Sequence, residues 1–147
     1  MELTDLYSTK ILELAGNIPT MPRLNDPQAT ARRVSRVCGS VVEVDLNLKD
    51  GRVSDYAHAV SACALGQTSA AIIAKHIIGA TPDELRTLRT QMIAMLKADG
   101  PPPSGKWAEL AYLQPVRDYK PRHASTLLVF EAVVDCLDQI ERQGAAA

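Results

Sequence analysis

The sequence VEVDLNLKDG, residues 42–51, carries the clearest structural pattern of the chain. Its first eight residues alternate apolar with polar side chains, which predicts a β-strand with one buried face and one face in water. Asp50 and Gly51 follow, and this pair accepts the positive φ angles of a tight hairpin turn. Residues 52–60 are therefore predicted to return as the antiparallel partner strand. A weaker strand, over about residues 31–37, is expected to precede them.

Helical patterns lie on both sides of this hairpin. Thr81-Pro82-Asp83-Glu84 combines a capping Thr with Pro at the first helical position and Glu three residues after the cap. Residues 17–28 contain three prolines and no period, which predicts an extended connection over the surface. The order of N-terminal helix, three antiparallel strands and further helices indicates an α+β fold with the helices packed on one face of a small sheet. The predicted helices cover about residues 3–15, 64–78, 82–98, 107–113 and 124–142.

Length and composition indicate one soluble domain that spans residues 1–147. We expect the Gly- and Pro-rich stretch from Gly100 to form a surface loop, within a loop insertion at about residues 99–121. Sixteen Lys and Arg against seventeen Asp and Glu leave a formal net charge of −1, which disfavours nucleic acid as a partner. No apolar run reaches the roughly 18 residues of a membrane span, and the first residues lack a signal-peptide pattern. We therefore expect a cytoplasmic protein with no membrane partner.

The three cysteines are the first candidates for chemistry, and their odd number and wide spacing disfavour a disulfide framework. Cys38 lies at the turn that enters the best strand, and Cys63 lies at the start of the helix that follows the hairpin. A thiol at a helix N-terminus deprotonates more easily, and the thiolate is the form that binds metals and attacks sulfur. Cys136, in contrast, falls on an apolar helical stripe and is predicted to belong to the core.

His123 is the remaining candidate, because it also lies at the end of an element, at the start of the last predicted helix. An imidazole beside two thiolates is an ordinary first shell for zinc. Sequence separation alone does not show that His123 meets Cys38 and Cys63. Glycine-rich phosphate loops, paired-cysteine zinc motifs and a recognisable spacing of nucleophile and base are absent, so we expect no enzyme.

Four short motifs together resemble a known family, the U-type iron–sulfur cluster assembly scaffolds that include NifU N-terminal, IscU and SufU proteins. The resemblance runs from about residue 3 to 140, and the order of elements matches. The wide separation between the last two long helices is similar to the SufU branch. The motifs are Val37-Cys38-Gly39-Ser40, Asp50-Gly51-Arg52-Val53-Ser54-Asp55, Ala62-Cys63-Ala64 and Arg122-His123-Ala124-Ser125-Thr126-Leu127.

The resemblance implies a site of three cysteines and an Asp two residues after the first, sometimes with a His beside the third cysteine. Cys38 and Cys63 match the first two thiols. The chain departs from this pattern because Ser40 stands at the Asp position and Ala124 at the third-cysteine position, with His123 just before it. Ala124→Cys is therefore predicted to raise the retention of a reconstituted cluster.

The first hypothesis is thus a scaffold-like protein that binds a metal ion or a transient iron–sulfur species through Cys38, Cys63 and His123. The cofactor expected there is a transient iron–sulfur cluster or zinc. The resemblance implies a cysteine desulfurase as sulfur donor and apo-proteins as recipients, and it leaves the oligomeric state open. The second hypothesis is a sulfur acceptor, with persulfide on Cys63, or an accessory protein of the assembly machinery that carries no cluster. A third, an unrelated hydrolase, is disfavoured.

Overall fold

The protein is described by a computed structural model in which residues 6–146 are placed. Its sheet has three antiparallel strands in the order β1 (Ala29–Val34), β2 (Val41–Lys49) and β3 (Arg52–Ser61). The β2–β3 turn has φ angles of 54° at Asp50 and 75° at Gly51, so the predicted hairpin is confirmed. β1 covers a slightly earlier stretch than predicted, because the chain turns back directly after Val34.

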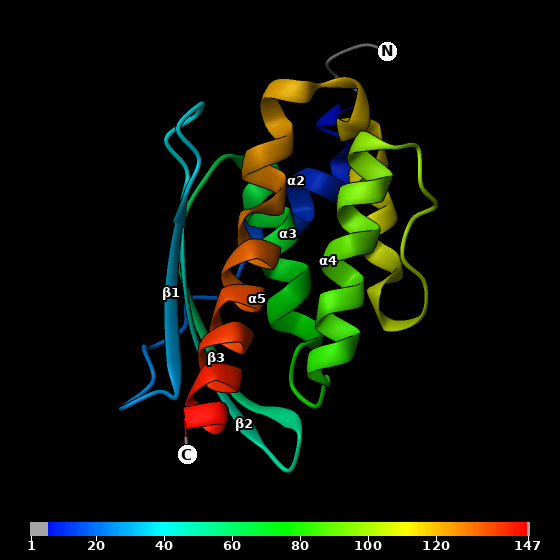
Figure 1. Cartoon of the computed structure of the whole chain (residues 1–147). Coiled ribbons are helices and arrows are strands. Elements are labelled where there is room, and N and C mark those ends of the chain that lie inside the picture. The colour runs from blue at the N-terminus through cyan, green and yellow to red at the C-terminus, as the bar shows by residue number, and fades with distance from the viewer. Residues whose placement is uncertain (1–5, 147) are drawn as a thin grey trace.

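The helices pack on one face of this sheet, as predicted, and Figure 1 shows them as a layer beside it. α5 lies against β1 and β2, α3 contacts β3, and α4 packs on α5. The first residues of the predicted N-terminal helix lie outside the described part of the chain. The helix layer contains the α-helices α2 (Thr9–Gly16), α3 (Ala64–His76), α4 (Pro82–Lys97) and α5 (His123–Ala146). The Thr81 hydroxyl accepts the backbone N–H of Glu84, which confirms the predicted cap of α4.

The segment between α4 and α5 is more regular than predicted: the short helix expected at about residues 107–113 lies within a longer one. Two 3-10 helices, η1 (Gly105–Asp118) and η2 (Lys120–Arg122), occupy most of it. A 3-10 helix repeats every three residues, so side chains three apart share one face. That face of η1 is buried in the core through Trp107, Leu110, Leu113 and Val116.

The core fills the space between the sheet and the helix layer, and Val42, Val44 and Leu46 of β2 are fully buried in it. The opposite face of β2 departs from the predicted alternation, because Asp45 is also buried, at 1% exposure. Two nitrogens of the Arg23 guanidinium donate to its two carboxylate oxygens at 2.7 Å each. The extended connection that carries Arg23 therefore covers part of the face that was predicted to lie in water.

Candidate functional site

A tight turn between β1 and β2 positions the first candidate thiol. The Ser35 N–H donates to the Ser40 carbonyl at 2.8 Å, and the Gly39 N–H donates to the Ser35 carbonyl at 2.8 Å. Gly39 has a φ of +71°, a left-handed conformation that costs glycine little and strains other residues. The turn holds Cys38 at the end of the sheet, where its side chain is partly exposed.

Hydroxyl groups surround the Cys38 sulfur. Its Sγ lies 2.9 Å from Ser40 Oγ and 3.6 Å from Ser35 Oγ, and both serines are buried. Burial by itself would raise the pKa of the Cys38 thiol, but hydrogen bonds from Ser40, Ser35 and Ser125 lower the pKa to about 7. A substantial fraction of Cys38 is therefore thiolate at neutral pH, the form that binds metals and attacks sulfur.

The second thiol, Cys63, is the N-cap residue of α3, and its side chain makes no capping hydrogen bond. Its Sγ lies 3.5 Å from Ser125 Oγ, in the first turn of α5. The same Ser125 hydroxyl is one of the groups that lower the pKa of Cys38. Both thiols, from separate elements, therefore lie near the buried Ser125 hydroxyl, at the end of the molecule where the β1–β2 turn, α3 and α5 come together.

Close packing of α3 against α5 makes this meeting possible. A Cβ built on Gly66 would lie 3.1 Å from the Ser125 carbonyl oxygen and 2.9 Å from the Ala62 Cβ, closer than ordinary contact. One turn further along α3, the Ser69 hydroxyl donates to the Thr126 carbonyl at 2.8 Å. The small residues of α3 therefore bring the start of α5 next to Cys63.

His123 does not join the thiols in this structure. Its Nε2 lies 3.0 Å from the Val116 carbonyl oxygen and 3.1 Å from that of Arg117, so the ring ties the end of η1 to the start of α5. Among residues 6–146, no group of three or more His, Cys, Asp and Glu side chains is placed to hold a metal ion. The structure therefore does not form the predicted three-ligand set of Cys38, Cys63 and His123.

The first residues of α5 face different sides of the helix. Ala124, matched by resemblance to the third cysteine, is exposed and lines a cavity together with His123 and residues of α4. The side chain that approaches the thiols is Ser125, one residue and about 100° further around the helix. Ser35 and Ser125 were not predicted as site residues, because a serine near an element end looks the same as an ordinary cap in sequence.

Cys136 belongs to the core, as predicted. It is fully buried, and its thiol donates to the Val44 carbonyl oxygen at 3.5 Å. Burial raises the pKa of the Cys136 thiol to about 12, so this sulfur is unreactive.

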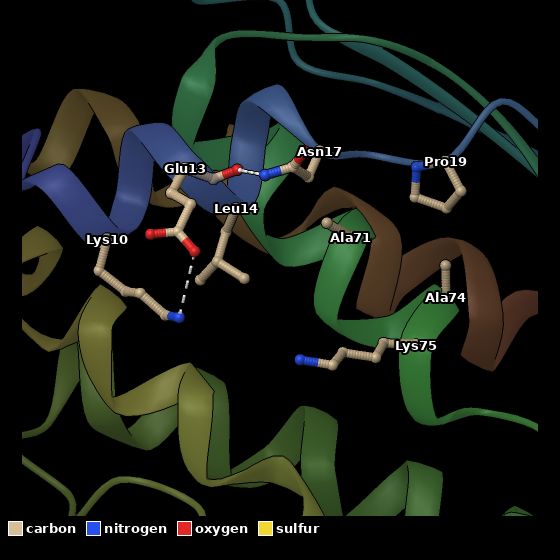
Figure 2. A pocket seen from close by; sticks show the side chains of 8 residues that line it. All are labelled: Lys10, Glu13, Leu14, Asn17, Pro19, Ala71, Ala74 and Lys75. Carbon is tan, nitrogen blue, oxygen red and sulfur yellow. Dashed lines mark hydrogen bonds and ion pairs between the residues drawn. The ribbon is translucent and has the colours of Figure 1, made fainter.

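A separate cavity of about 390 Å³ lies between α2 and α3, and neither thiol lines it. Figure 2 shows Lys10 and Lys75 beside an apolar floor that includes Leu14. Lys10 pairs with Glu13 at 3.7 Å, and Lys75 pairs with Glu109 at 3.0 Å. The charges around this cavity are therefore neutralised within the protein.

A three-stranded antiparallel sheet covered on one face by helices, with two partly exposed cysteines near one end, defines a small α+β protein with a thiol site. The family model described as the NifU-like N terminal domain matches residues 6–126. The chain therefore belongs to the NifU N-terminal and IscU-like family of iron–sulfur cluster assembly scaffolds, which are not enzymes.

Individual relatives agree with this assignment. A solved NifU-like protein (N-terminal) from Brucella abortus is 54% identical, with a TM-score of 0.92 over 94% of this chain and 96% of that one. The iron–sulfur cluster assembly scaffold protein IscU of Thermotoga maritima is 23% identical over 93% of this chain and 96% of its own length. A SUF-system scaffold structure from Fervidobacterium islandicum AW-1 shares the fold, with 17% identity, a TM-score of 0.81, and 90% and 96% coverage. In the described residues, no helix is long and apolar enough to cross a membrane.

Proposed function

We propose that this protein works in iron–sulfur cluster assembly by binding a metal ion or a transient iron–sulfur species, as cargo, through Cys38 and Cys63. The observation that carries the proposal is the position of both cysteines near the Ser125 hydroxyl, which lies 3.5 Å from the Cys63 sulfur and lowers the pKa of Cys38. Thiolates are the ligands that zinc and iron–sulfur clusters use most. Both cysteines are partly exposed, which leaves the cargo open to exchange.

The donor set favours brief binding over storage. An iron–sulfur cluster takes about four protein ligands, and this site offers two thiols among hydroxyl groups. The remaining positions are filled from outside the set, by water, by sulfide or by a thiol of another protein. Ser40, which the resemblance matches to the family's Asp, is an uncharged neighbour of Cys38 at 2.9 Å, and we propose that cluster release here does not use a carboxylate at this position.

A second candidate function, sulfur acceptance, is favoured by the surroundings of Cys38. The hydroxyls of Ser40 and Ser35 stabilise its thiolate, and a thiolate attacks the outer sulfur of a persulfide. The sequence placed this role on Cys63, and the structure favours Cys38. In both candidates the partners we propose are a cysteine desulfurase and recipient apo-proteins, in the cytoplasm.

Anaerobic reconstitution with iron and sulfide tests the first candidate. We expect the parent protein to retain iron and labile sulfide after desalting, and Cys38→Ala or Cys63→Ala to lose most of both. Cys136→Ala is the matched control, because that thiol is buried away from the site, and it is expected to retain what the parent retains. Retention that survives the loss of both exposed thiols would refute the proposed site.

A further inference from the structure

Two features of the thiol site suggest chemistry beyond metal binding. First, the two sulfurs have unequal hydroxyl neighbours: Ser35 and Ser40 both contact the Cys38 sulfur, while the Cys63 sulfur lies 3.5 Å from Ser125 Oγ. Second, in the described residues the group lacks a third His, Cys, Asp or Glu ligand. The site is therefore a pair of thiols in different surroundings. Such a pair is suited to thiol–disulfide exchange, in which one thiolate attacks first and the second thiolate then attacks the bond that the first has formed.

We propose that Cys38 and Cys63 form a persulfide-reducing pair: Cys38 accepts sulfur from a persulfide, and Cys63 releases it as hydrosulfide. This inference rests on the sulfur-acceptor candidate above and extends it by naming the fate of the sulfur. Clusters are built from sulfide, whereas a persulfide delivers sulfur that is two electrons more oxidised. The thiol pair supplies those two electrons.

The chemistry has two steps. In the first, the Cys38 thiolate attacks the outer sulfur of a persulfide R–S–SH; the Cys38–sulfur bond forms, the donor's S–S bond breaks, and the donor leaves as R–S⁻. In the second, the Cys63 thiolate attacks the inner sulfur of the new Cys38 persulfide. A Cys38–Cys63 disulfide forms, and the outer sulfur leaves with the bonding electron pair and its proton as HS⁻. The two thiols lose two electrons and the transferred sulfur gains two, so one turnover needs no other reductant. A dithiol reductant returns the pair to the thiol state for the next turnover.

The structure supports each role. Cys38 lies in a turn at the end of the sheet, with Gly39 beside it, so this sulfur is carried by a short loop and not by a helix. Cys63 is held by α3, and nothing caps the helix through its side chain, so its sulfur is not engaged in stabilising the helix end. Ser125 Oγ lies 3.5 Å from the Cys63 sulfur and donates its hydrogen to the Arg122 carbonyl at 3.2 Å, and the same hydroxyl lowers the pKa of Cys38.

Glutathione persulfide is the probe that tests this inference, with oxygen and free thiols removed before the measurement. We expect the reduced parent protein to release about one hydrosulfide per chain and to lose two hydrogens in mass. Peptide mapping is expected to find Cys38 joined to Cys63. Cys63→Ser is expected to stop at the first step, so that it gains one sulfur atom at Cys38 and releases little hydrosulfide. Cys136→Ala is the control and is expected to behave like the parent.

The outcomes separate the inference from the function on which it rests. A stable persulfide on the parent protein, without a disulfide, would overturn the reducing pair and leave sulfur acceptance intact. Neither persulfide nor hydrosulfide on the parent would refute sulfur acceptance itself, and the inference with it. Hydrosulfide release from Cys63→Ser at the parent's level would also overturn the inference, because Cys63 would then have no role in the second step.

Discussion

At the scale of single residues, the chemistry of Cys38 depends on its hydroxyl neighbours. Its pKa of about 7 results from hydrogen bonds that together outweigh burial, and the Ser40 contact at 2.9 Å is shorter than the Ser35 contact at 3.6 Å. Ser40→Ala removes that hydrogen bond, so we expect the pKa of Cys38 to rise. The rate of alkylation against pH measures it, in a Cys63→Ser background where Cys38 is the exposed thiol. A titration midpoint that is unchanged by Ser40→Ala would contradict this explanation.

At the start of α5, one position determines whether an added cysteine would lie beside Cys38 and Cys63. Ser125 faces the two thiols and Ala124 does not, so Ser125→Cys is expected to add a thiolate to the site and raise iron and sulfide retention after anaerobic reconstitution. Ala124→Cys is the matched control, one position away on the same helix. We expect it to retain no more than the parent, contrary to the prediction drawn from family resemblance. A larger gain from Ala124→Cys than from Ser125→Cys would restore that prediction.

At the scale of elements, the contact of α3 with α5 sets the position of Ser125. Gly66→Ala would force the Ser125 carbonyl or Ala62 to move, and we expect it to lower the free energy of unfolding by about 1–3 kcal/mol. Gly16→Ala, at the end of α2, is the control, because nothing lies within 4 Å of the added Cβ. Urea unfolding of both variants makes the comparison. Equal stability of the two would mean that α5 is free to shift.

Helices and strands whose sequence pattern depends on neighbouring residues were predicted well. The alternation around Val44 gave β2, and the Thr81 cap gave the start of α4, because strand pleat and capping depend on residues close in sequence. η1 was underestimated, since its apolar residues recur every three positions, a period that a search for α-helical spacing does not match. The site was predicted only in part. Cys38 and Cys63 were predicted because each lies at the end of a predicted element. Ser125 was missed because its direction depends on how α5 packs against α3, and the two helices are far apart in sequence.

At the scale of the whole molecule, the ion pair of Arg23 with Asp45 holds the connection at residues 17–28 to the outer face of the sheet. The two residues are 22 positions apart in sequence. The Arg23 guanidinium holds the pKa of Asp45 below its usual value. The folded state is therefore stabilised by this pair above the ordinary Asp pKa of about 4, and the stabilisation disappears as the pH falls through the lowered pKa. Sequence periodicity could not reveal the buried Asp45, because its partner comes from another segment.

Arg23→Met tests this contact across the molecule. We expect it to lower the free energy of unfolding at pH 7 by about 1–2 kcal/mol, allowing for solvent around the guanidinium. In strong acid, where Asp45 is protonated, the same substitution is expected to lower the free energy of unfolding much less. Arg36→Met, at an exposed arginine, is the control. Denaturant unfolding at the two pH values is the measurement. The same loss at both pH values would show that Arg23 contributes through packing and not through its charge.

The central claim is that Cys38 and Cys63 form one cargo site, and zinc X-ray absorption tests it most directly, because zinc brings no sulfide of its own. With one equivalent of zinc, the parent protein is predicted to show about two sulfur neighbours at about 2.3 Å, with oxygen or nitrogen completing the shell. Cys38→Ala and Cys63→Ala are each predicted to lose one of these sulfurs, and Cys136→Ala to lose none. A zinc shell without sulfur in the parent, or one that keeps both sulfurs in either single variant, would contradict the account.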